Sequence, residues 1–119
     1  MVISFSIQEA RDQLLDKGEV YTYRWLRRAF FRDEKGDVES TWANEGRGTK
    51  RIADVEIREI GQFEASEETL EPYWEKSGFF NPAHWMIIVL DFMGGIYADR
   101  NGYLYYVSIK SDTKRMFEQ

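Results

Sequence analysis

The segment 18–24, with the sequence GEVYTYR, carries the residues of this chain whose types and spacing could do chemistry. In an extended strand the side chains alternate between two faces, so Val20, Thr22 and Arg24 share one face. That face places a hydroxyl beside a guanidinium, a pair that could hold a phosphate, a base edge or an oxyanion. The alternative is structural, with Thr22 as an ordinary strand former and Arg24 in a surface ion pair at the strand end.

The sequence around this strand predicts further ligand-binding side chains. Arginine makes paired hydrogen bonds to phosphate and stacks on bases, and aromatic rings can stack on bases as well. The predicted ligand-binding cations and rings are Arg24, Tyr21, Trp25, Lys50 and Arg51. Arg27 and Arg28 could join them. For Trp25 and Phe31 a place in the core is the favoured interpretation, because aromatic residues are a common way to fill a core.

Charge is unevenly distributed along the chain, whose formal net charge is −5. Residues 24–51 include eight basic and five acidic residues, a net charge of +3. Residues 52–75 include one basic and eight acidic residues, a net charge of −7. This split could give an acidic protein one basic face, or the two segments could simply pair with each other.

Length and composition indicate an ordinary globular protein. A chain of 119 residues can bury a core without disulfides, and we expect a single domain over residues 1–110 and a polar tail over 111–119. No apolar run approaches the roughly 18 residues of a membrane span. The N-terminus lacks the features of a signal peptide, and the chain has no cysteine, so we expect a cytoplasmic protein. The absence of cysteine excludes cysteine zinc sites, and the single histidine, His84, leaves a carboxylate-rich site as the only kind of metal site open to the chain. We expect no metal, no cofactor and a structural role for His84.

The N-terminal half predicts strands and one amphipathic helix. Residues 2–5 suggest a short strand, and Ser6-Ile7-Gln8-Glu9 has the form of a capping box that would start a helix. Gly18 would end this helix, whose core-facing residues are Ile7, Ala10, Leu14 and Leu15. Residues 25–48 are irregular, and we expect a hairpin with a mobile tip around residues 33–37. Residues 49–61 alternate as a half-exposed strand, with its buried face at Ala53, Val55 and Ile57.

The C-terminal half predicts two helices and a final strand. Ser66 or Thr69 would cap a short helix limited by Pro72 and ending near Gly78. Asn81-Pro82 would start a second helix, stopped by Gly94-Gly95, with a buried stripe at Trp85, Ile88, Val89 and Phe92. A turn at residues 99–102 then leads into the strand 103–109, which we expect to be central. This order of elements predicts an α+β fold, in which a small mixed sheet curls into a barrel flanked by about three short helices.

The order of these elements and several local segments resemble the ASCH domain family, in the PUA-like superfamily of small β-barrels. The resemblance covers most of the chain and is carried by the following segments, given with their positions in this sequence: LLDKG (14–18), YTYR (21–24), KRIADVEI (50–57), KSGF (76–79), the helix of Trp85 and the final strand. It implies a cleft walled by the strand of Thr22 and the turn near Gly78, which would bind RNA or a modified nucleoside.

The resemblance also bears on possible catalysis. Some family members hydrolyse the acetyl amide of acetylated cytidine or are linked to RNA cleavage, and they use a lysine, a threonine and a glutamate. The threonine falls on Thr22, whereas Glu19 stands at the lysine position and Ser77 at the glutamate position. Glu75 lies two residues before Ser77. A carboxylate in place of the lysine would repel a developing oxyanion, which argues against the amidohydrolase chemistry.

Three functions follow as expectations from the sequence. The first is binding of RNA or a nucleotide through Arg24 and its neighbours, with Ser77 beside the cleft. The second is a hydrolase acting on RNA or a modified nucleoside, with Thr22 as the reactive hydroxyl and Glu19 or Glu75 as the base. The third is a module whose acidic segment, residues 54–75, binds a basic protein partner.

Overall fold

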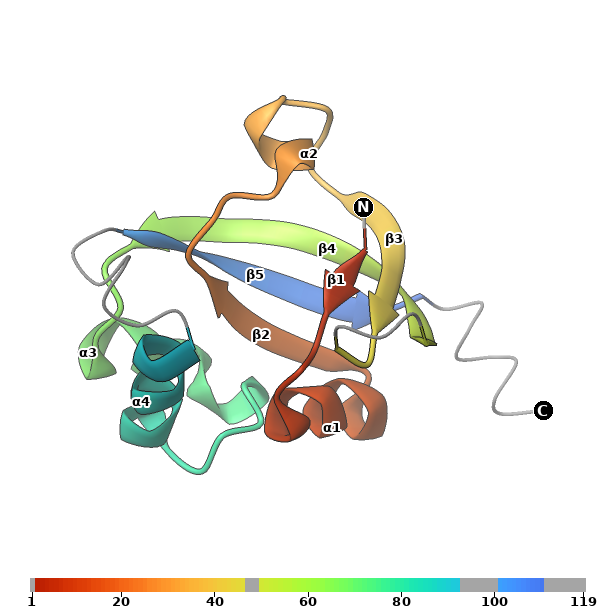
Figure 1. Ribbon diagram of the computed structural model, residues 1–119. Coiled ribbons are helices and arrows are strands. Elements are labelled where there is room, and N and C mark those ends of the chain that lie inside the picture. The colour runs from red at the N-terminus through yellow and green to blue at the C-terminus, as the bar shows by residue number, and fades with distance from the viewer. Residues whose placement is uncertain (1, 47–49, 93–100, 111–119) are drawn as a thin grey trace.

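The computed structural model of the protein describes residues 2–46, 50–92 and 101–110, with only the backbone at residue 92 (Figure 1). The strands are β1 (Ile3–Ser4), β2 (Glu19–Arg24), β3 (Glu39–Asn44), β4 (Arg51–Phe63) and β5 (Gly102–Ile109). The helices are α1 (Gln8–Lys17), α2 (Ala29–Arg32), α3 (Glu67–Leu70), the 3-10 helix η1 (Glu71–Lys76) and α4 (Pro82–Phe92).

The five strands form one curled mixed sheet, a half-barrel, in the order β1-β3-β4-β5-β2. β1 pairs with β3 in parallel, and the other neighbours pair antiparallel. The predicted α+β class and the curled mixed sheet are confirmed, although four α-helices are described where about three were expected. β1 and β2 are the two edge strands, and α1, α3 and α4 lie on the side of the sheet where these edges approach each other (Figure 1). β5 was predicted to be central; it is an interior strand between β4 and β2, but β4 holds the middle of the sheet.

The register of the sheet brings small and branched apolar residues into one layer. Val20 of β2 is the partner of Val107 of β5, which is in turn the partner of Ile57 of β4, and all three are fully buried. The predicted buried face of β4 is therefore confirmed. A second buried cluster, which includes Trp85 and Leu104, packs on the other side of β2 and β5 beneath α3 and α4.

α1 ends as the sequence predicts but begins differently. Gly18 adopts φ +81°, and its N–H donates to the Leu14 carbonyl at 2.8 Å, which confirms the predicted helix end. The capping box at Ser6 was wrong, because the N-cap is Ile7 and no side chain caps the helix. Leu15 was also wrongly placed in the core. It follows Leu14 by about 100° around the helix and is 43% exposed.

The segment after β2 holds a helix in place of the predicted hairpin. α2 is followed by a turn in which Glu34 has φ +54°, and the next strand, β3, pairs with β4. A helix of four residues is too short to show a period in the sequence, and its N-cap, Arg28, makes no side-chain cap. The mobility predicted for the tip of this segment stays a prediction.

The caps of α3 and α4 confirm two local predictions. Ser66, not Thr69, is the N-cap of α3, and the two side chains form a reciprocal capping box. Pro72 lies at the start of η1. Asn81 Oδ1 accepts from the His84 N–H at 2.7 Å at the start of α4, and His84 Nδ1 accepts from the Phe80 N–H.

The buried stripe of α4 is confirmed at Trp85 and Val89, whereas Ile88 is only partly buried. Several predictions lie outside the described residues: the burial of the Phe92 side chain, the stop at Gly94-Gly95, the first two residues of the turn at 99–102 and the tail at 111–119. No helix in the described ranges has both the length and the apolar character needed to cross a membrane.

Candidate functional site

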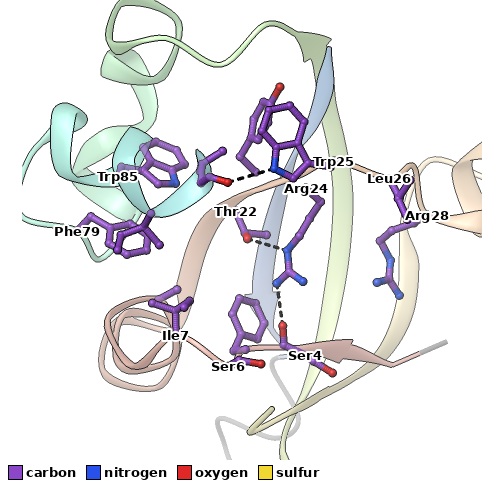
Figure 2. Close-up of a pocket in the computed structure, with 15 residues that line it drawn as sticks. Ser4, Ser6, Ile7, Thr22, Arg24, Trp25, Leu26, Arg28, Phe79 and Trp85 are labelled. Carbon is purple, nitrogen blue, oxygen red and sulfur yellow. Dashed lines mark hydrogen bonds between the residues drawn. The ribbon is translucent and has the colours of Figure 1, made fainter. Parts of the chain in front are cut away.

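Arg24 is the last residue of β2. Its side chain extends toward β1 across the open seam, the side of the half-barrel where the edge strands β1 and β2 are not paired. Its Nε donates to Thr22 Oγ1 at 3.0 Å, and its Nη2 donates to the Ser4 carbonyl of β1 at 2.9 Å (Figure 2). The guanidinium carbon lies 5.2 Å from the centroid of the Phe5 ring. The hydroxyl–guanidinium pair predicted from strand alternation is therefore confirmed, and Arg24 bridges the two edge strands.

Arg24 carries a positive charge for which the described part of the chain supplies no ion-pair partner, since none of its carboxylates pairs with this side chain. Burial, together with the neighbouring Arg28 cation, lowers the pKa of Arg24 to about 10. A guanidinium has more N–H donors than the two bonds use, so Arg24 can still donate to an anion.

A cleft of about 270 Å³ lies beside Arg24. One wall is the chain from β1 into α1, residues 4–7, and another is the end of β2 with residues that follow it, 22–26. Phe79 and three residues of α4 form the facing, apolar wall (Figure 2). The cleft therefore has a polar side at the seam of the sheet and an apolar side at α4.

Aromatic packing fixes the apolar wall. Trp85 is 1% exposed, and its ring is stacked with that of Phe79 at a centroid distance of 6.4 Å. Trp25 is also buried, which confirms the predicted core position, and its Nε1 donates to the Val89 carbonyl at 3.1 Å. Trp25 thus ties the end of β2 to α4 while lining the cleft.

Ser77 supports this wall without lining the cleft. Its buried hydroxyl donates to the Trp74 carbonyl at 2.7 Å and accepts from the Phe79 N–H at 3.1 Å. These two bonds set the turn from which Phe79 projects. Ser77 was predicted to contact the ligand. In the structure its hydroxyl instead holds the turn that carries Phe79, and Phe79 lines the cleft.

Arg28 is the second cation of the cleft, and it is held by Glu39. Arg28 Nε lies 2.7 Å from Glu39 Oε1, and Nη2 lies 3.1 Å from Oε2. Both side chains are largely buried, with 11% of Arg28 and 6% of Glu39 exposed. The pair is bidentate and well shielded from water, so Arg28 contributes little free charge.

A tyrosine anchors the backbone that carries Arg28. Tyr105 Oη accepts from the Arg28 N–H at 2.9 Å and donates to Glu59 Oε2 at 3.3 Å. Glu59 in turn accepts two bonds from Arg27, at 2.7 and 2.9 Å. Tyr105 is fully buried, and burial raises its pKa to about 12.

This pKa predicts a loss of stability in alkali that depends on Tyr105. The unfolded chain releases the phenol proton near pH 10 and the native protein only near pH 12, so stability falls as the pH rises between these values. A shift of this size corresponds to about 3 kcal/mol. Denaturant unfolding at a series of pH values should show a shallower alkaline decline in Tyr105→Phe than in the wild type. Parallel declines would contradict this assignment.

The predicted catalytic carboxylates lie away from Thr22. Glu19 lies on the opposite face of β2, where it accepts from Tyr106 Oη at 2.8 Å and pairs with Lys76. Glu75 is exposed on η1. The structure therefore does not bring Thr22, Glu19 and Glu75 into one site. Thr22 itself is buried and lines the cleft.

Three of the predicted ligand-binding side chains also lie outside the cleft. The Tyr21 ring packs between those of Tyr73 and Tyr106, each at a centroid distance of 5.1 Å. Lys50 and Arg51 are exposed at the start of β4.

The basic segment is largely neutralised by its own neighbours and by the acidic segment. Arg27 pairs with Glu59, and Arg51 pairs with Asp54 at 3.5 Å. The remaining ion pairs of this segment in the described residues are Arg28–Glu39, Arg32–Asp33 and Lys50–Glu45. The alternative in which the two charged segments pair with each other is confirmed for Arg27 and Arg51.

Several cleft residues were not identified as site residues from the sequence. Phe79, Trp85 and Val89 form a wall only because α4 packs against β2, and Ser4 contributes a backbone carbonyl that no side-chain pattern reveals. Glu39 lies in the segment predicted to be irregular. Its alternation with Thr41 and Ala43 was the one available sign that it belongs to the inner face of a strand.

Fold and site together define an α+β protein with a half-barrel sheet and a partly apolar cleft between the edge strands β1 and β2, with Arg24 beside it. No protein-family model, no curated protein and no solved structure matches the chain.

Proposed function

We propose that this protein binds RNA or a nucleotide in the cleft beside Arg24. The observation that carries the proposal is the state of Arg24, a partly buried cation fixed by Thr22 and Ser4 that keeps N–H donors available. A planar guanidinium fixed in this way suits the oxygens of a phosphate. The sequence resemblance to the ASCH family, with its implied RNA or nucleoside ligands, supports the same function.

The shape and lining of the cleft support one nucleotide unit as the occupant. Its volume of about 270 Å³ is slightly below the range of about 300–1,000 Å³ of pockets for drug-sized ligands. The apolar wall at Phe79 and Ile88 faces the polar side at Arg24. A ligand with one flat ring and one anionic group matches both sides, because the ring buries apolar surface while the anion meets the guanidinium.

The composition of the lining favours binding over hydrolysis. Of the described residues that line the cleft, none is a carboxylate or a histidine that could take a proton from Thr22. The Thr22 hydroxyl already accepts from Arg24 Nε. Binding is therefore the function that we propose, and a protein-interaction module is the outcome of the test below if no nucleotide binds.

Replacing Arg24 by methionine should weaken nucleotide binding at least about tenfold, because a hydrogen bond to a charged group contributes about 1.5–3 kcal/mol. The measurement is equilibrium ultrafiltration of the purified protein with nucleosides, nucleotides and short single-stranded RNA at low and moderate salt. Thermal unfolding of the variant shows whether it remains folded after losing the bond to Ser4.

Arg51→Met is the matched control, since it also removes one positive charge but lies outside the cleft. It should bind as the wild type does. Equal losses in both variants would indicate binding over the general surface. No binding of any nucleotide to the wild type would remove the proposal and favour a protein-interaction module.

A further inference from the structure

Glu39 occupies an unusual position for a carboxylate, since it is 4% exposed on the inner face of the sheet. It does not line the cleft, but it is paired with Arg28, which does. We infer that Glu39 sets the charge of the ligand. By pairing with Arg28 it leaves Arg24 as the one cation without an ion pair among the described residues that line the cleft, which then accepts a singly charged phosphodiester unit in preference to a terminal phosphate. This inference rests on the proposed function and goes beyond it to the class of nucleotide.

The charges around the cleft carry this inference. Arg24 and Arg28 are the charged side chains in the described lining, and Glu39 is the carboxylate bound to one of them. Arg28 directs its Nε and Nη2 at the two oxygens of Glu39, and its Nη1 lies within 3.4 Å of the Val2 carbonyl. Its donors are thus turned toward protein groups. Among the described side chains, the two cations and the one carboxylate sum to one positive charge.

A cleft with one available positive charge distinguishes a phosphodiester from a terminal phosphate. A phosphodiester carries one negative charge, whereas a terminal phosphate carries about 1.5–2 near neutral pH. Moving the extra charge into a partly buried, mostly apolar cleft has a desolvation cost that only a second available cation would offset. Because Glu39 holds that second cation, a nucleotide inside an RNA chain or a cyclic phosphate fits better than a free 5′-monophosphate.

The test compares two sets of probes that share their bases and differ in charge. These are the four nucleoside 2′,3′-cyclic monophosphates and the four 5′-monophosphates, with dissociation constants measured by ultrafiltration or calorimetry. The wild type should prefer the cyclic forms. Glu39→Gln keeps an acceptor for Arg28 but removes the negative charge beside it, and should shift the preference toward the 5′-monophosphates by about tenfold, the effect of about 1.4 kcal/mol of added attraction.

Glu59→Gln is the matched control. It changes the net charge by the same amount and also releases a bidentate arginine, but Glu59 and its partner Arg27 do not line this cleft. In this variant the ratio of the affinities for the cyclic monophosphates and the 5′-monophosphates should stay at the wild-type value. An equal shift in both variants would overturn the inference, because it would reflect the overall charge of the protein.

A second measurement decides the question if Glu39→Gln does not fold. The affinity of the wild type for a single-stranded tetranucleotide should fall with salt with a log–log slope of about 0.7, the value for one phosphate contact. A slope that corresponds to two or more contacts would overturn the inference, as would nucleotide binding with no change of preference in a folded Glu39→Gln. In both cases the proposed function survives. If neither set of probes binds the wild type, the proposed function fails and the inference fails with it.

Discussion

Gly78→Ala should destabilise the protein by about 3 kcal/mol or more, as the sum of backbone strain and a steric clash. Gly78 has φ +89°, a conformation that costs other residues energy. A Cβ at this position would also lie 2.3 Å from the Glu9 carbonyl oxygen and 2.9 Å from Gln13 Cβ, both in α1. The first neighbour is backbone, so relief requires α1 to move away from the turn that carries Phe79.

Gly18→Ala separates the two causes. Gly18 has nearly the same backbone conformation, φ +81°, but a Cβ at this position would have no atom within 4 Å. The free energy of unfolding of Gly18→Ala should fall by only about 1 kcal/mol, the cost of the backbone conformation alone. Urea unfolding of both variants gives the two free energies. Equal losses would mean that α1 and the turn at Gly78 adjust without cost, and the close approach would then not hold the cleft wall in place.

Local patterns were sufficient to predict the elements that carry the polar side of the site. Alternation in the strand 19–24 places Thr22 and Arg24 on one face, and their hydrogen bond in the structure follows directly from that spacing. Gly18, Ser66 and Asn81 mark helix ends through interactions within a few residues, so these boundaries could also be predicted. In each case the physical cause lies inside a short segment of sequence.

The position of a residue along a long strand could not be predicted in this way. Lys50 and Arg51 follow the same alternation rules as Thr22, but their distance from the cleft is set by the register of the whole sheet. Val55 is already the partner of Ile109 at the end of β5, so Arg51 extends past the end of β5 and away from the cleft. The charge excess of residues 24–51 gave no information on this register.

The apolar wall and the Arg28–Glu39 pair depend on tertiary packing. Arg28 and Glu39 are separated by α2 and its turn, which the sequence pattern did not reveal, and their pairing is set where β3 joins the sheet. The burial of an acidic residue also runs against the usual preference of glutamate for solvent. A prediction based on residue type therefore places Glu39 on the surface, and its effect on the charge of the cleft becomes visible only in the structure.

Trp85→Ala should destabilise the protein by about 3–5 kcal/mol, the usual cost of removing a large buried aromatic side chain. Trp85 of α4 is 1% exposed, belongs to the core cluster that packs on β2 and β5 and also lines the cleft, so its loss removes packing from both. Phe79 would lose the ring against which it stacks at 6.4 Å. Nucleotide affinity should therefore fall as well, because the apolar wall would no longer be fixed.

Phe80→Ala is the control for the destabilisation expected in Trp85→Ala. It shows whether the loss of stability requires a buried ring or follows from removing any aromatic ring near the start of α4. The Phe80 side chain is 83% exposed, so its removal should change the free energy of unfolding by no more than about 0.5 kcal/mol. Trp85→Phe keeps a ring at this position, so its free energy of unfolding should lie between those of Trp85→Ala and Phe80→Ala. If Trp85→Ala lost stability but bound nucleotide with wild-type affinity, the wall at α4 would act only as core, and the ligand would be held by the polar side at Arg24.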